Sequence, residues 1–417
     1  MGGSGRPRGD DDRYHRDGLS APVGGAGGPA AGSLPALHPG ERRDGLPSSH
    51  PVLRGSRYLR SGAADPKDRG DPGSPRSAGD RFPFRVARSG SSGLATAMSA
   101  LRVQEIREQG FPALRLENGP LTLTLIPDLG GKIAVWEDRR RGLSWLWRNP
   151  YLPWRLPQAE ARYVQEFDLG GWDECFPAIA PGIYPADPWV GTPIPDHGEL
   201  WSQPWKIQIR IEEGKRLIVT GAAEGRSFPY RFERTLILEA DRPAVRIRYR
   251  LQNNAEHTFY FLWAAHPLFP LLPGMRLLIP GPATARVAAA IGVAPQAMVF
   301  PWPQLPIEGG FLDLREPDPE GKWALKLFLR PAASWARLIH PTGAWWEIGW
   351  RGPITHLGLW INAGGWSGAN TPPYQNLALE PAIGAPDDLG VAMREWGFFG
   401  LLPPLQEMEW SLQVTVG

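Results

Sequence analysis

Two histidines and one glutamate in this chain are the side chains best suited to acid–base chemistry. His197 stands in the segment PDHGELWSQPW, and His266 follows an apolar run in FLWAAHPLF. Glu380 ends the apolar run LALE, immediately before Pro381 turns the chain. A buried carboxylate is costly unless it is paired or used, and histidine is the side chain that exchanges a proton near neutral pH. These residues predict a reaction that removes one proton and delivers another, if the fold brings them together.

Each of these residues also has a plain structural explanation. His197 would be a loop histidine, His266 a core histidine whose hydrogen bonds are satisfied, and Glu380 the cap of a turn. The other three histidines after residue 97 are interpreted as solvated or structural, and they are His257, His340 and His356. The chain has no phosphate-binding glycine loop, no zinc-type spacing of Cys and His, and no Gly-x-Ser-x-Gly elbow. We therefore expect neither a cofactor nor a metal.

The first 97 residues differ sharply from the rest of the chain. About 30 of them are Gly or Pro, none is Trp, and 15 Lys and Arg stand against 10 Asp and Glu. This composition is typical of low-complexity sequence, which does not bury enough apolar surface to fold. We expect residues 1–97 to be a disordered extension or a wrongly assigned start, and residues 98–417 to form a single domain.

The charge of residues 98–417 gives little reason to expect a polyanionic partner. This part carries 30 basic and 33 acidic residues, so we predict binding neither to nucleic acid nor to membrane. The chain shows no signal peptide and no apolar run of membrane-spanning length. Cys175 is the only cysteine, which favours a reducing compartment, and we expect a cytoplasmic protein.

The elements that must position these residues are strands. Apolar and polar residues alternate in LTLTLI (121–126), KIQIRIEE (206–213), AVRIRYRL (244–251) and several later runs, with Gly and Pro between them. Many strands separated by turns rich in Gly and Pro predict an all-β, antiparallel, two-sheet sandwich. The aromatic segment 148–200 reads as a long ordered loop that covers or lines a site.

Four segments together resemble the galactose mutarotase-like superfamily, which comprises the aldose 1-epimerases and related proteins. They are IPDLGGKIAVWEDRRRGLSWLW, GGWDECFPAIAP followed by HGELW, WAAHPLF, and LALEPAIGAPDDL. They occur in the family's order and span residues 126–389. The resemblance implies a large antiparallel β-supersandwich and a small-molecule sugar as partner.

The resemblance also implies roles for the site residues. Glu380 would be the general base that takes the proton of the anomeric hydroxyl, and His266 the general acid that protonates the ring oxygen. His197 would bind and orient the sugar. The further substrate-binding candidates are Asp173, Trp172, Trp201 and Trp366.

Departures from the family pattern leave alternatives open. Pro195 and Asp196 stand before His197, and Ala265 stands before His266, where the aldohexose enzymes usually carry Asn. The leading hypothesis is an aldose 1-epimerase type of isomerase that interconverts sugar anomers. The alternative is a carbohydrate-binding β-sandwich without turnover. A third is a different reaction on the same sandwich, such as that of a polysaccharide lyase.

Overall fold

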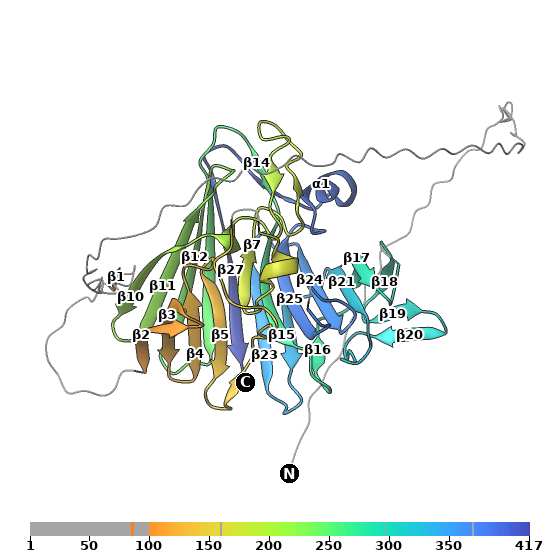
Figure 1. Cartoon of the computed structure of the whole chain (residues 1–417), viewed down its shortest axis with the longest axis horizontal. Coiled ribbons are helices and arrows are strands. Elements are labelled where there is room, and N and C mark those ends of the chain that lie inside the picture. The colour runs from red at the N-terminus through yellow and green to blue at the C-terminus, as the bar shows by residue number, and fades with distance from the viewer. Residues whose placement is uncertain (1–84, 87–99, 159–160, 296, 369–370) are drawn as a thin grey trace, which may run out of the picture. The chain divides into compact units, whose positions relative to one another are not determined.

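The computed structural model describes residues 85–86 and 100–417, apart from 159–160, 296 and 369–370. Within these residues the chain forms two large β-sheets packed face to face, as the alternation predicted (Figure 1). The predicted extension 1–97 lies outside the described residues, except for the two-residue strand β1 (Arg85–Val86). Among the helices that are described, none has the length and apolar character needed to cross a membrane.

One sheet has nine strands in the order β1, β10, β11, β12, β13, β27, β23, β22, β16. In β12, buried residues alternate with half-buried ones along the whole strand, because one face packs on the core and the other faces solvent. The bounds are β10 (Lys206–Glu212), β11 (Arg216–Glu224), β12 (Tyr230–Glu239), β13 (Ala244–Asn253), β27 (Glu407–Val416), β23 (Trp345–Arg351), β22 (Trp335–Ile339) and β16 (Arg276–Leu278).

The other sheet has twelve strands, and several central ones are buried on both faces. Its order is β18 (Val299–Pro301), β17 (Thr284–Ile291), β21 (Ala324–Leu329), β24 (His356–Ala363), β25 (Gln375–Ile383), β15 (Trp263–Pro270), β7 (Trp172–Cys175), β5 (Lys132–Asp138), β4 (Leu121–Ile126), β3 (Phe111–Asn118) and β2 (Leu101–Glu108), with β6 (Leu143–Ser144) beside β5. Burial on both faces means that further chain must cover this sheet.

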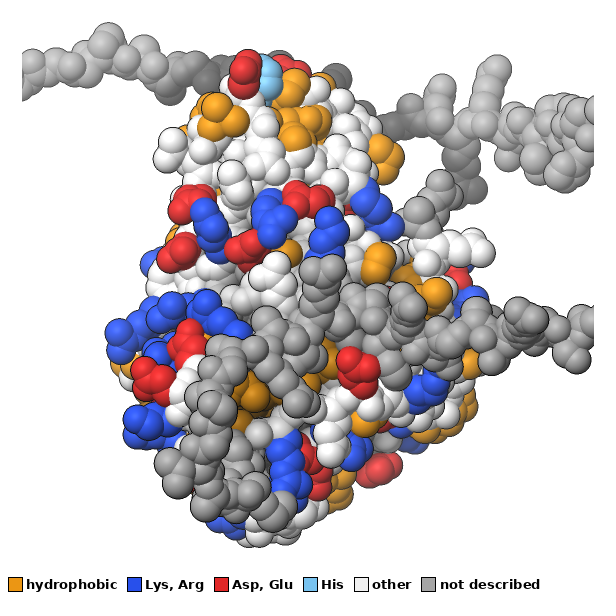
Figure 2. All heavy atoms as spheres, turned by 90° about the vertical axis from the view of Figure 1, so that its left-hand side faces the viewer, with side chains coloured by type: hydrophobic (Ala, Val, Ile, Leu, Met, Phe, Trp, Pro, Cys, Tyr) orange, Lys and Arg blue, Asp and Glu red, His pale blue; other side chains and the backbone are white. Residues whose placement is uncertain are grey.

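Short elements complete the described part of the chain. Three two-stranded ladders pair β8 (Gly182–Ile183) with β9 (Pro193–Ile194), β14 (Phe259–Phe261) with β26 (Gly400–Leu402), and β19 (Gln304–Ile307) with β20 (Gly310–Asp313). The helical turns are η1 (Tyr163–Phe167), η2 (Leu200–Ser202), α1 (Leu389–Val391) and η3 (Ala392–Trp396). Basic and acidic side chains are interspersed on the face shown in Figure 2.

Large aromatic side chains fill the space between the two sheets. Trp136 and Trp172 from the twelve-stranded sheet stack with ring centroids 5.9 Å apart. Trp346 from the nine-stranded sheet meets both edge-on, at 6.3 Å and 6.2 Å. All three are fully buried, and burial of one such ring contributes about 4–6 kcal/mol of transfer free energy.

A buried ion pair also joins the sheets. Glu174 on β7 accepts hydrogen bonds from Arg234 Nη1, Tyr249 Oη and Trp263 Nε1, each at 3.0 Å. Burial raises the pKa of Glu174 to about 7, because the desolvation of its charge outweighs the help from Arg234 and the other donors. This carboxyl belongs to the packed interior between the sheets.

The segment 148–200 is more than the long loop that its composition predicted. It contains β7, a central strand of the twelve-stranded sheet, so Asp173 lies on a strand. The ends of two further strands also differ from expectation, because each strand continues beyond its predicted site residue. His266 lies in the middle of β15, and Glu380 lies three residues before the end of β25, because both strands continue across the sheet centre.

Candidate active site

Four ionisable side chains form a row across adjacent strands in the middle of the twelve-stranded sheet. His266 on β15 pairs with Asp173 on β7. The β15–β25 pairs on either side set His266 opposite Glu380. Lys132 on β5 completes the row through an ion pair with Asp173. Because successive side chains of a strand alternate between faces, the row lies on the face opposite to Trp172 and the core.

Glu380 and His266 face each other at close range. The Oε1 atom of Glu380 lies 3.1 Å from the Nδ1 atom of His266. Neither atom has another partner among the described residues. Glu380 is fully buried, while His266 is 7% exposed. The pair therefore places a carboxylate oxygen and an imidazole nitrogen side by side, each without a further partner in the described part of the chain.

Lys326 on β21 holds the second oxygen of Glu380. Its Nζ donates to Glu380 Oε2 and also lies 3.5 Å from Oδ1 of Asp387, just beyond β25. Burial alone raises the pKa of Glu380, but the charges of Lys326 and His266 outweigh it and bring that pKa to about 2. Burial lowers the pKa of Lys326, and the charges of Asp387 and Glu380 outweigh this and raise it. The pair is ionised at neutral pH.

A glycine leaves the space that Glu380 occupies. Gly358 on β24 pairs with Glu380 across the ladder. A Cβ at Gly358 would lie 3.2 Å from Glu380 Oε2 and 3.3 Å from the ring of Phe328. These contacts are tight, so a side chain at position 358 would require Glu380 or Phe328 to shift by a few tenths of an ångström.

Asp173 has one engaged oxygen and one free oxygen. Its Oδ2 accepts from Lys132 and, at 2.8 Å, from the hydroxyl of Tyr163 on η1. Its Oδ1 is buried without a partner in the described part of the chain. A buried unpaired acceptor is unfavourable, and a donor supplied by a ligand would satisfy it.

The segment between β7 and β10 brings His197 over this row. The ring of His197 stacks on Tyr163 with centroids 4.0 Å apart, and its centroid lies 5.2 Å from that of His266. Nδ1 of His197 lies 2.9 Å from Oδ1 of Asp196. Burial raises the pKa of Asp196, but the hydrogen bond and charge of His197 outweigh it, so the net pKa is lowered.

The His-Gly dipeptide has a steric reason. His197 has a φ of 60° and Gly198 a φ of 75°, and a Cβ at Gly198 would lie 1.9 Å from the carbonyl oxygen of Phe176. Only glycine fits there. The tight turn holds His197 in place, and its backbone N–H donates to Ile179 at 2.7 Å.

The predicted tryptophans occupy three different places. Trp172 is fully buried between the sheets, because its neighbour Asp173 takes the site face of β7. Trp201 packs edge-on against Tyr163 at 5.0 Å and is 4% exposed. Trp366 is partly exposed and meets Tyr374 edge-on at 6.0 Å. Of the three, Trp366 is thus the one that is not buried.

Sequence reasoning did not find the charged partners of the row or a second carboxylate nearby. Asp168 is buried, and its Oδ2 accepts from the hydroxyl of Tyr374 at 2.6 Å. Burial raises its pKa against the hydrogen bond from Tyr374 and the charges of His266, His197 and Lys132. A usable signal was the single lysine in the apolar strand ALKLFLR, because a buried lysine needs a carboxylate partner.

No protein-family model matches this chain, and no curated protein matches it. Solved structures do match. A provisionally assigned aldose 1-epimerase from Klebsiella pneumoniae is 14% identical, with a TM-score of 0.55 over 76% of this chain and 83% of that one. One from Escherichia coli K12 is 18% identical, with a TM-score of 0.50 over 73% and 98%. A galactose mutarotase-like protein from Clostridium acetobutylicum is 13% identical, with a TM-score of 0.50 over 76% and 99%.

Proposed function

We propose that this chain, which has the fold of the galactose mutarotase-like proteins, interconverts the anomers of a sugar. The observation that carries the proposal is the opposition of Glu380 and His266, whose Oε1 and Nδ1 atoms lie 3.1 Å apart with no other partners in the described part of the chain. A base and an acid must each come within hydrogen-bond reach of the oxygen that it serves, and the two oxygens on C1 of a sugar ring are neighbours, so the two groups must be neighbours as well.

In the proposed reaction, Glu380 accepts the proton of the anomeric hydroxyl. The bond between C1 and the ring oxygen breaks, its electron pair goes to the ring oxygen, and His266 delivers a proton there. The open-chain aldehyde rotates about its C1–C2 bond. Ring closure then returns the proton to His266 and the other proton to the new anomeric hydroxyl, so no atom is gained or lost.

The surroundings support these roles. Because the pKa of Glu380 is held at about 2, the carboxylate is ionised at neutral pH and is in the form that accepts a proton, but this low pKa makes it a weaker base than one whose pKa lies near the working pH. In our proposal His197 and the free oxygen of Asp173 bind sugar hydroxyls. Trp201 supports Tyr163 from behind, and Trp366 lies at the margin of the sugar site. Lys132 and Lys326 are already paired with carboxylates, which favours an uncharged sugar over a phosphorylated one. Cytoplasmic residence stays a prediction.

Polarimetry tests the proposal. Freshly dissolved α-anomers of glucose, galactose and other aldoses should reach equilibrium faster with the protein than in buffer. Glu380→Gln should lower this rate by about 10²–10⁴-fold, the usual contribution of one proton transfer. The exposed Glu105→Gln should leave it unchanged. Relaxation at the buffer rate for every sugar tested would refute the enzymatic assignment.

One observation favours a second candidate, a sugar-binding protein without turnover. The side chain of Glu380 is only 1% exposed, and Lys326 occupies one of its oxygens. A base so enclosed has little freedom to reach a substrate. Calorimetry separates the two candidates, because saturable sugar binding without faster mutarotation fits only the second one.

A further inference from the structure

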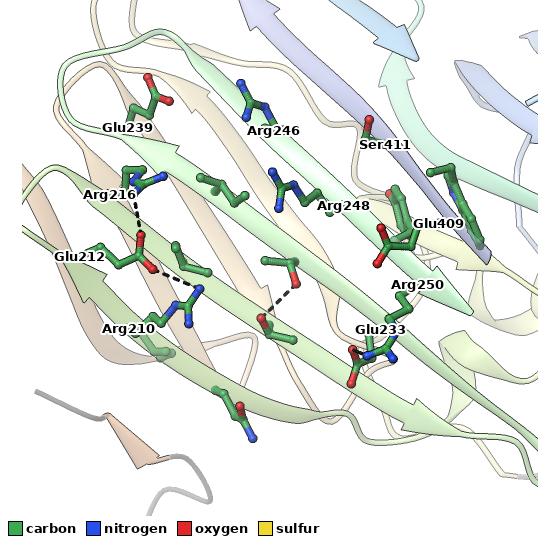
Figure 3. A pocket seen from close by; sticks show the side chains of 18 of the residues that line it. Arg210, Glu212, Arg216, Glu233, Glu239, Arg246, Arg248, Arg250, Glu409 and Ser411 are labelled. Carbon is green, nitrogen blue, oxygen red and sulfur yellow. Dashed lines mark hydrogen bonds and ion pairs between the residues drawn. The ribbon is translucent and has the colours of Figure 1, made fainter. Parts of the chain in front are cut away.

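A hollow of about 1240 Å³ lies on the outer face of the nine-stranded sheet, on the sheet opposite to the candidate active site. Strands β10, β11, β12, β13, β27 and β23 supply its lining (Figure 3). A second hollow of about 560 Å³ shares Arg246, Arg248 and Arg351 with it, so the two form one extended depression. We call it the arginine hollow.

A polar row crosses the arginine hollow from strand to strand. Its members pair in register and turn away from the core, because the residues between them are buried. From β10 to β23 they are Gln208, Thr220, Thr235, Arg248, Ser411 and Arg351. Adjacent strands are about 4.8 Å apart, so the two arginines of the row stand about 10 Å apart with a hydroxyl between them.

Three arginines of the hollow have no partner among the described residues, and all three are exposed: Arg246, Arg248 and Arg351. Figure 3 shows Arg246 and Arg248 side by side on β13 without a dashed line to any neighbour. Most acidic side chains nearby are engaged. Glu212 binds Arg210 and Arg216 at 3.1 Å and 2.9 Å, and Glu233 binds Arg231.

The unpaired charge at the hollow is therefore mainly positive. Glu409 is the exception, and it stands opposite Arg250 in the β13–β27 register, beyond the three free arginines. Arg250 itself pairs with Glu407. Guanidinium groups hold carboxylates and sulfates through paired, charge-assisted hydrogen bonds. The free arginines thus favour a ligand with several separated acid groups.

We propose that the arginine hollow binds an acidic glycan, whose carboxylates or sulfates lie on Arg246, Arg248 and Arg351. The threonine and serine hydroxyls of the row would meet sugar hydroxyls between the acid groups. This site is independent of the proposed epimerase reaction and lies on the other sheet.

Two other occupants fit less well. Single-stranded nucleic acid needs exposed aromatic side chains for base stacking, and the hollow's Tyr249 and Trp410 are 1% and 4% exposed. The N-terminal residues 1–97 carry an excess of five basic charges, so they do not complement arginines.

Calorimetry with the full chain tests the proposal, using polygalacturonate oligomers, dextran sulfate, neutral dextran and oligo-dT as probes. The two acidic glycans should bind, with an affinity that falls as salt rises. Arg248→Ala/Arg351→Ala should raise their Kd about tenfold or more. Arg102→Ala/Arg141→Ala, which removes two exposed arginines elsewhere, is the matched control and should change Kd less than twofold.

Both variant pairs keep the basic N-terminal residues, so the difference between them isolates the arginine hollow. Equal affinities of the two variants for the acidic glycans would overturn the proposal, and so would absent binding. Tighter binding of oligo-dT that depends on Arg248 and Arg351 would overturn the glycan assignment in favour of nucleic acid. Circular dichroism should give the same spectrum for all variants, since these side chains are exposed.

Discussion

Lys326 joins Glu380 on β25 to Asp387 in the turn that follows, so one ammonium serves two carboxylates on either side of a strand end. Its charge, together with that of His266, keeps a fully buried glutamate ionised. The same contact makes Lys326 the residue that sets the pH range of the proposed base.

Replacement of Lys326 by Met should move the acidic limb of the kcat/KM profile upward. Without the ammonium, only His266 opposes the effect of burial, and the pKa of Glu380 rises from about 2. The limb should shift by about two or more pH units. Polarimetry between pH 3 and pH 8 should show no acidic limb in the native protein, where the pKa of Glu380 lies below this range, and a limb within it for the variant. The exposed Lys206→Met is the control, and an unmoved limb would show that Lys326 does not act on the base.

The substitution His197→Asn should weaken sugar binding more than it slows turnover. Asn tolerates the positive φ at this position, so the turn at Gly198 is kept while the imidazole is lost. We expect KM or the sugar Kd to rise about tenfold, the value of one or two hydrogen bonds, with a smaller change in kcat. A larger fall in kcat than rise in KM would instead assign His197 to the chemistry.

Stability should fall between pH 6.5 and pH 4 because of His356. Burial, aided by Arg330, lowers its pKa from 6.5 to about 4. As the pH falls, the unfolded chain takes up the proton first, so the native state loses about 2–3 kcal/mol across this window and no more below it. Urea titrations of the native protein and His356→Gln should diverge there. The exposed His257→Gln should follow the native curve.

The buried pair of Glu174 and Arg234 should respond non-additively to substitution. Glu174→Leu leaves the guanidinium buried without its carboxylate and should cost about 3–5 kcal/mol. Glu174→Leu/Arg234→Met removes both charges and should cost less than the sum of the single changes. Denaturant unfolding of the native protein, Glu174→Leu, Arg234→Met and the double variant gives the coupling energy. Additive losses of stability would contradict an inter-sheet ion pair.

The positions of the half-buried strands could be predicted from the sequence, and those of the fully buried central strands were harder to predict. The alternation at 206–213 and 244–251 predicted β10 and β13 to within two residues, because one face of each strand meets solvent. The strand β7 was missed. It has four residues that are buried on both faces, so WDEC carries no alternation.

The candidate site shows the same division. Glu380, His266 and His197 were predicted from their types and neighbours, Asp173 was added from the family resemblance, and the fold brings the four together. The ion pairs with Lys132 and Lys326 depend on the register between strands far apart in sequence, which local patterns do not determine. Trp172 illustrates the limit, since one position along β7 separates the site face from the core.

The row of charged residues across β5, β7, β15 and β25 requires that each of these strands keeps its charged side chain on the same face of the sheet. Loss or gain of a single residue within one strand would turn its contribution into the tryptophan-filled interior and bring an apolar side chain to the other face. The site can therefore change through point substitutions, one position at a time. Insertions and deletions that preserve it must fall in the connections, so length variation among descendants of this sequence should be confined to turns.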